Sequence, residues 1–195
     1  MPLPPLILAS ASPRRRALLQ EHGYAFSVEP ADVTESAPAH LTPGEITLRN
    51  ARAKAKAVSR KNPEALVLGV DTEVVFEREV FGKPADMAAA LAMVRRLRGR
   101  AHEVHTGVWL CHAATRYDRG FVEISRVFFR PLTDAQIRTY HARIGPLDKA
   151  GAYAAQDDGG ELIACVEGSF TNVIGLPMEA LAKALYDFQF EPRQG

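Results

Sequence analysis

The stretch Leu66–Asp86, LVLGVDTEVVFEREVFGKPAD, constrains the fold of this chain more than any other part of it. It opens with an apolar, β-branched run over residues 66–70, which is typical of a strand buried on both faces. Asp71 and Thr72 follow where that strand would reach its carboxyl end. Because ligand crevices in open α/β sheets lie at the carboxyl ends of strands, the sequence predicts an α/β fold with a carboxylate beside a ligand site.

The second half of this stretch predicts a hairpin. Residues 74–76 are apolar, Glu77-Arg78-Glu79 form a polar turn, and Val80-Phe81 lead back to Gly82-Lys83-Pro84. A hairpin would bring Lys83 toward Asp71. A carboxylate and an ammonium held in this way could position a metal or a water molecule and neutralise phosphate charge. A structural ion pair beside a turn is the alternative on these residues alone.

Composition limits the possible partners. The chain of 195 residues is long enough for one domain, 1–195, with a sizeable core. Its 24 basic and 23 acidic residues nearly cancel, so no global field attracts nucleic acid or a membrane surface, and any anion site must be local. The two cysteines lack C-x-x-C spacing, and the start MPLPPLILAS has neither a basic segment nor a long apolar run. We therefore expect reduced thiols and a cytoplasmic protein without a signal peptide.

A local anion site is predicted near the start of the chain. A short strand, Leu6–Leu8, is followed by small residues, by Ser12 as a helix N-cap and by Pro13 as the first helical residue. Arginines 14–16 then occupy the first turn, where acids are usually preferred. Free backbone N–H groups, serine hydroxyls and arginines together favour a bound anion over a merely solvated helix face.

A second helix is predicted to present a lysine inward. Thr42 and Glu45 form a capping box that starts a helix over residues 43–60. Lys54 shares a helix face with Asn50 and other small or apolar residues, so it should point into the protein. An unpaired buried charge costs several kcal/mol, and Lys54 therefore needs an anionic partner. The preceding loop carries Glu35, although acids in such loops are most often simply solvated.

The rest of the chain predicts further strands and helices around one functional loop. Asp86 should cap a helix over 87–98, and the small, polar segment 147–160 is best interpreted as a functional loop. His102 and His105 are three apart, and we expect them to lie on the surface rather than to form a metal site. The remaining expected elements are strands over 24–28, 104–111, 121–129, 162–167 and 170–174, a turn over 113–120, and helices over 133–143 and from Pro177.

Several of these segments together resemble the Maf family of nucleoside triphosphate pyrophosphatases. The matching motifs are LASASPRR over residues 8–15, GVDT over 69–72, GKP over 82–84, DKAGAY with a glutamine over 148–156, and GSFTNVIGLP over 168–177. The resemblance implies an elongated, mixed and strongly twisted sheet flanked by helices with a central cleft, akin to inosine triphosphate pyrophosphatases and often dimeric. It also implies hydrolysis between the α and β phosphates with a divalent cation, for which the short acid list suits magnesium or manganese.

The resemblance also assigns roles to individual residues. Asp71 matches the proposed general base, and with Glu35 it would face the metal. The other matching positions bind substrate: Ser10, Arg14, Lys54 and Lys83 line the cleft, while Arg15, Thr72 and Gln156 match positions associated with dTTP and UTP preference. A glutamine amide both donates and accepts, so Gln156 can pair with the imide edge of uracil or thymine. Modified pyrimidine triphosphates are further possible substrates.

One departure from the family pattern and one rival function stay open. Asp157 and Asp158 follow Gln156 where relatives commonly carry a less acidic turn, and two extra carboxylates could repel substrate or join the metal shell. The rival is a non-catalytic, nucleotide-binding regulator of septum formation and cell division. A nucleic-acid-binding role is disfavoured because the charge is balanced and Trp109 stands alone in a strand.

Overall fold

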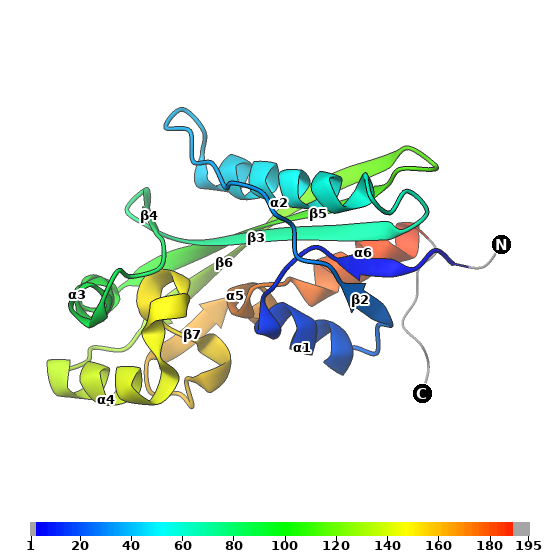
Figure 1. Cartoon of the computed structure of the whole chain (residues 1–195). Helices are drawn as coiled ribbons and strands as arrows, with labels where there is room; N and C mark the ends of the chain where they lie inside the picture. Colours follow the sequence, from blue (N-terminus) through cyan, green and yellow to red (C-terminus); the bar gives the residue numbers. More distant parts are fainter. Residues whose placement is uncertain (1–2, 189–195) are drawn as a thin grey trace. The chain divides into compact units, whose positions relative to one another are not determined.

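The computed structural model describes residues 3–188 and confirms an α/β fold. A seven-stranded, mixed and twisted open sheet is flanked by helices (Figure 1). The strand order is β2-β1-β3-β5-β6-β7, with β4 paired to β3. The strands are β1 Leu6–Leu8, β2 Phe26–Val28, β3 Leu66–Phe76, β4 Glu79–Phe81, β5 Ala101–His112, β6 Tyr117–Phe129 and β7 Ile163–Glu167.

Five of the six α-helices in the described part of the chain were expected from the sequence, and α5 (Phe170–Ile174) was not. The α-helices are α1 Pro13–Glu21, α2 Pro43–Ser59, α3 Met87–Leu97, α4 Asp134–Ile144, α5 Phe170–Ile174 and α6 Met178–Asp187. Three 3-10 turns, η1 Pro146–Asp148, η2 Ala150–Ala152 and η3 Ala155–Asp157, lie in the predicted functional loop. None of the helices between residues 3 and 188 is long and apolar enough to cross a membrane.

The chain divides into two compact units, each of which is described by itself. Unit 1 consists of residues 3–71, 106–123 and 175–188, and unit 2 of residues 72–105 and 124–174. Strands β3, β5 and β6 contribute residues to both units. The expectation of a single domain stays a prediction.

Unit 1 is built on the parallel strands around β1. Leu6 pairs with Phe26 of β2 on one side and with Leu66 of β3 on the other. Helix α2 packs directly on the sheet, because Gly69 and Gly107 leave room for its backbone: a Cβ at Gly69 would lie 2.1 Å from the Ala51 carbonyl oxygen. Figure 1 shows α2 running along β3. The close contact brings the inward face of α2 to the carboxyl end of the parallel strands.

Local signals fix the starts of α1 and α2 as predicted. The Ser12 hydroxyl accepts a hydrogen bond from the Arg15 N–H at 3.5 Å, which caps α1. At α2, the Thr42 hydroxyl accepts from the Glu45 N–H at 3.3 Å, and the Glu45 carboxylate accepts from the Thr42 N–H at 2.8 Å. Both contacts involve residues three apart, so they could be read from the sequence.

Unit 2 contains the predicted hairpin and an aromatic core. Val74 of β3 pairs with Phe81 of β4, and the two turn residues Glu77 and Arg78 have positive φ of 51° and 68°, as a two-residue hairpin turn of the I′ type requires. Helix α3 places its predicted apolar positions in the core, where all four are buried: Ala90, Leu91, Val94 and Leu97. The hairpin therefore packs against a well-packed core.

The prediction that His102 and His105 of unit 2 lie on the surface is wrong. The two residues are only 3% and 7% exposed, so they do not lie on the surface. Strand β5 begins at Ala101, earlier than expected, which places His102 in the core. There its Nε2 is hydrogen-bonded to the Tyr153 hydroxyl at 2.9 Å, and its ring packs edge-on against Phe129 with centroids 4.7 Å apart. The bond to Tyr153 makes this burial tolerable.

Two further expectations need correction. Residues 170–174 form helix α5 and not a strand, because the Ser169 hydroxyl accepts from the Asn172 N–H at 3.2 Å and starts a helical turn. The turn predicted over 113–120 is shorter, since β6 begins at Tyr117 and the left-handed residue Arg116, with φ of 56°, completes the reversal. In both places the apolar pattern alone predicted the wrong type or the wrong length for a short element.

Candidate functional site

Asp71 lies at the end of the unit 1 part of β3 and is 5% exposed. Both of its carboxylate oxygens accept hydrogen bonds from α2. Oδ1 accepts from the Lys54 ammonium at 2.7 Å, and Oδ2 accepts from the Asn50 amide nitrogen at 3.1 Å. The carboxylate is therefore fixed in orientation. The expected end of the strand at Asp71 is wrong, because β3 continues to Phe76, and Asp71 instead follows the part of β3 that pairs with β1.

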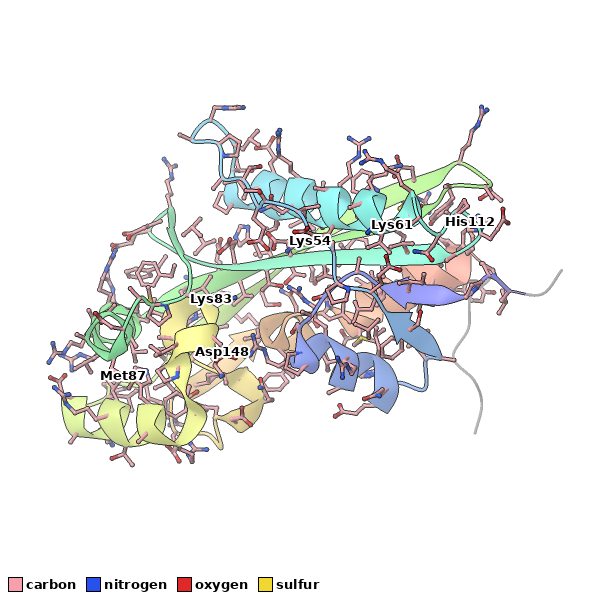
Figure 2. All side chains as sticks on the ribbon, viewed as in Figure 1. Lys54, Lys61, Lys83, Met87, His112 and Asp148 are labelled. Carbon is pink, nitrogen blue, oxygen red and sulfur yellow. The ribbon has the colours of Figure 1, made fainter. Side chains whose placement is uncertain are left out.

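Lys54 confirms the expectation that an inward lysine needs anionic partners. Its side chain is 12% exposed, and its Nζ lies 2.6 Å from Glu35 Oε1 in addition to its contact with Asp71. The same ammonium donates to the Val70 carbonyl at 3.4 Å. Figure 2 shows Lys54 on α2, facing β3. One ammonium thus links the loop acid Glu35 to the strand acid Asp71.

Asn50 is a site residue whose role the sequence reasoning missed. It is 4% exposed, and its Oδ1 accepts from the Ser36 N–H at 3.0 Å while its Nδ2 donates to Asp71. Arg49 adds a bond from its Nε to the Ser36 hydroxyl at 3.2 Å. The available signal was a polar residue on the inward face of α2, one turn before Lys54. Asn50 holds the loop next to Glu35 and orients Asp71 at the same time.

Arg15 connects three backbone segments of unit 1. Its Nη1 donates to the Ser10 hydroxyl and to the Val70 carbonyl, each at 3.1 Å, and its Nε donates to the Gly175 carbonyl at 2.9 Å. Burial lowers the pKa of Arg15 to about 10, an effect that the charge of Asp71 opposes and that of Arg14 reinforces. Since this pKa is far above neutrality, Arg15 stays cationic.

Arginines 14–16 give the start of α1 a positive charge that no acid in its first turn offsets. Arg14 is partly buried there, and Arg15 shares the Val70 carbonyl with Lys54. The contacts thus form a continuous network through unit 1 that joins Ser10, Arg15, Lys54, Asp71 and Glu35. Five of the nine predicted site residues are brought together by these contacts, and Arg14 acts electrostatically on the same group.

Three predicted site residues belong to unit 2. Thr72 is partly buried, whereas Lys83 and Gln156 are exposed. The Gly82 carbonyl, next to Lys83, accepts from the Gly151 N–H at 3.1 Å. The Gln156 Nε2 donates to Asp157 Oδ2 at 3.1 Å, which orients the amide. The expected approach of Lys83 to Asp71 stays a prediction.

The two extra carboxylates after Gln156 have different surroundings. Asp158 is 4% exposed, and its oxygens accept from the backbone N–H groups of Leu162 at 2.9 Å and Ile163 at 3.0 Å. It therefore fixes the start of β7, and these bonds explain its burial without any metal. Asp157 is exposed.

Glu35 and Asp71 fit a hard divalent cation in donor chemistry. Both offer carboxylate oxygens within hydrogen-bonding distance of the same cationic group, the Lys54 ammonium. No group of three or more His, Cys, Asp or Glu residues that could hold a metal occurs within residues 3–188. A cation that keeps several waters and takes only one or two carboxylates is compatible with this pair, as magnesium usually is.

Comparisons with known proteins cover nearly the whole chain. A family model described as Maf-like protein matches residues 5–188. The protein of Pelotomaculum thermopropionicum named dTTP/UTP pyrophosphatase is 44% identical over 185 residues, 95% of this chain and 97% of that protein. Proteins of the same name from Akkermansia muciniphila and Myxococcus xanthus are 44% and 47% identical over 186 and 173 residues, covering 94% and 89% of this chain and 96% and 87% of their own lengths. All nine predicted site residues lie within the matched range.

Proposed function

Since this chain belongs to the Maf-like protein family, we propose that it is a nucleoside triphosphate pyrophosphatase that hydrolyses dTTP and UTP to the monophosphate and pyrophosphate. The names of its relatives support this substrate class. Modified pyrimidine triphosphates share the same imide edge, so we include them among the candidate substrates. A homodimer, which the family resemblance implies, stays a prediction.

The observation that carries the proposal is the fixed carboxylate of Asp71. Hydrolysis of a phosphoanhydride needs a water molecule held in line with the bond that breaks, and positioning with charge stabilisation supplies most of the rate. Lys54 and Asn50 each donate to one oxygen of Asp71, so the carboxylate cannot rotate freely. Asp71 would orient this water and accept its proton as the oxygen attacks phosphorus.

The positive groups of unit 1 support phosphate binding. The N–H groups at the start of α1, the Ser10 hydroxyl and the side chain of Arg14 would contact the phosphate chain, with Arg15 adding positive charge behind them. Lys83 is a further candidate for phosphate binding. Thr72 and Gln156 would read the base: with Gln156 Nε2 oriented by Asp157, its Oε1 can accept from the N3–H of uracil or thymine.

Glu35 and Asp71 would hold a divalent cation, magnesium or manganese. When bound, such a cation neutralises charge on the phosphate oxygens. Lys54 would continue to compensate the two carboxylates and would hold Asp71 in place for the proton transfer.

The experiment is a panel of nucleoside triphosphates with magnesium and detection of pyrophosphate. We expect dTTP and UTP to be the preferred substrates, and Asp71→Asn to lower kcat by about a hundredfold or more while leaving nucleotide binding largely intact, because general-base catalysis is typically worth that factor. Asp118→Asn is the matched control, because this unit 1 carboxylate instead pairs with Lys56 at 2.8 Å. It should retain wild-type turnover.

Two results would contradict the proposal. Near wild-type dTTP hydrolysis by Asp71→Asn would remove Asp71 as the base. Binding of dTTP without any release of pyrophosphate by the wild-type protein would favour the nucleotide-binding regulator instead.

A further inference from the structure

The segment of residues 150–158, which carries Gln156, has a backbone that requires external support. We call it the Gln156 segment. Gly151 has φ of 69° and Ala152 has φ of 60°. A left-handed conformation at a non-glycine residue such as Ala152 costs about 1 kcal/mol or more, and it persists only where the surroundings impose it.

Helix α4 supplies this support through three side chains. The Tyr140 hydroxyl donates to the Ala154 carbonyl at 3.1 Å and accepts from the Ala154 N–H at 3.0 Å. His141 Nε2 is hydrogen-bonded to the Ala152 carbonyl at 3.0 Å, and Arg143 Nη1 donates to the Asp157 carbonyl at 2.6 Å. The backbone of the Gln156 segment is thus held two residues before Gln156, at Ala154, and one residue after it, at Asp157.

The ends of the segment are also attached within unit 2. The Gly151 N–H donates to the Gly82 carbonyl, next to Lys83, and the Asp158 carboxylate accepts from the N–H groups of Leu162 and Ile163 at the start of β7. A shift of the segment would therefore move Gln156 and strain the backbone beside Lys83. No contact from α4 to the Gln156 side chain is needed for this effect.

From these contacts we infer that Tyr140, with His141 and Arg143, is a positioning residue that sets base selectivity by holding the Gln156 segment. This inference rests on the proposed function, because it requires that Gln156 reads the base. It adds a determinant of selectivity on a helix that carries none of the expected site residues.

The environment of Tyr140 separates positioning from simple packing. Its side chain is 1% exposed, and Ala154 is 3% exposed, so neither can replace the lost bonds with bulk water. Tyr140→Phe would keep the ring in the core but leave the Ala154 N–H and C=O without their partner. Because buried, unsatisfied polar groups are costly, the segment is expected to rearrange toward solvent and displace Gln156.

Tyr153→Phe is the matched control. Tyr153 is a buried tyrosine within the Gln156 segment itself, at 6% exposed, but its hydroxyl bonds to the His102 side chain and to no backbone group of the segment. Each variant loses one buried tyrosine hydroxyl. Only Tyr140→Phe removes bonds to the backbone of the segment, at Ala154, two residues before Gln156.

The measurement is kcat/KM for UTP and for CTP, whose base presents an acceptor and an amino group where uracil presents N3–H and a carbonyl. We expect Tyr140→Phe to lower the UTP-to-CTP ratio by about fivefold or more, within the factor that one hydrogen bond is worth, mainly through KM for UTP. Hydrogen exchange at the Ala154 amide should accelerate in Tyr140→Phe. Tyr153→Phe should keep the wild-type ratio and the wild-type exchange rate at this amide.

Arg143→Met provides a second variant in case Tyr140→Phe does not fold. The Arg143 side chain is 47% exposed, so its replacement should be tolerated, and loss of its bond to Asp157 should lower the ratio in the same direction. A folded, active Tyr140→Phe or Arg143→Met protein with an unchanged UTP-to-CTP ratio overturns the inference. A ratio lowered equally by Tyr153→Phe also overturns it. Absence of pyrophosphate release by the wild-type protein refutes the proposed function instead, and the exchange rate at Ala154 then decides whether α4 holds the segment.

Discussion

A single methyl group at residue 69 should damage the site, although Gly69 has no side chain and makes no contact with substrate in the proposed mechanism. In Gly69→Ala, the new Cβ would lie 2.1 Å from the Ala51 carbonyl oxygen and 2.7 Å from the Ala55 backbone nitrogen. Both obstacles are main-chain atoms of α2, so no side-chain rotation can relieve them. Ordinary van der Waals contact would therefore require α2 and β3 to separate by on the order of 1 Å.

This separation would break the contacts that hold Asp71. Asn50 and Lys54 lie on α2, and their hydrogen bonds to Asp71 measure 3.1 Å and 2.7 Å. Bonds stretched by about 1 Å no longer meet hydrogen-bond geometry. Overpacking of this kind costs about 1–3 kcal/mol of unfolding free energy, whereas a misplacement of about 1 Å at reacting groups can cost about a hundredfold in rate. A hundredfold in rate corresponds to about 2.7 kcal/mol of activation free energy, so we expect a large fall in kcat in molecules that are still folded.

The assay combines urea unfolding with steady-state pyrophosphate release under conditions where the variant is folded. Gly82→Ala is the stability control, because a Cβ there would meet nothing within 4 Å. It should change the unfolding free energy by less than about 1 kcal/mol. Wild-type kcat and stability in Gly69→Ala would refute the conclusion that the spacing of α2 and β3 positions Asp71.

Two further changes test the site and the core. Gln156→Glu should reduce the preference for dTTP and UTP, because a carboxylate cannot donate to a ring carbonyl; a substrate panel with unchanged selectivity would count against base reading by Gln156. His102→Gln should make stability less sensitive to acid. Burial lowers the pKa of His102 to about 3, so below about pH 6.5 the unfolded chain binds a proton at this residue and the folded protein does not. Stability is therefore lost as the pH falls through this window. The loss amounts to about 1.4 kcal/mol per pH unit, or about 2.7 kcal/mol by pH 4.5, and denaturant unfolding at pH 7 and pH 4.5 should show that much less change in the variant.

The sequence predicted most elements because their signals are local. The caps Ser12, Thr42, Asp86 and Thr133 each act on a backbone N–H three residues ahead, and all four start the expected helices. The failures came where distant residues decide the outcome. The burial of His102 depends on Tyr153, a residue 51 positions later in the chain, and no local pattern can report such a partner.

In the site, too, residues with local signals were predicted and contacts between distant residues were not. Asp71 was predicted from the end of a buried strand and Lys54 from the inward face of a helix, and the structure joins them directly. The use of Arg15 could not be predicted, because its carbonyl partners at Val70 and Gly175 lie 55 and 160 positions away and carbonyl groups have no sequence signature. Asn50 was placed on the correct face, but only its two partners reveal that it orients a carboxylate.

The reach of Asn50 explains why a glycine is needed beneath α2. A lysine has four methylene groups and can span a wide gap, so Lys54 alone would tolerate a more distant helix. An asparagine has one methylene, and its amide can meet Asp71 at 3.1 Å only if the two backbones approach closely. Gly69 and Gly107 permit that approach, with the positions of their absent Cβ atoms 2.1 Å and 2.3 Å from α2 backbone atoms. The orientation of the Asp71 carboxylate therefore depends on both glycines and on the short Asn50 amide. A change in any of them should alter the position of Asp71.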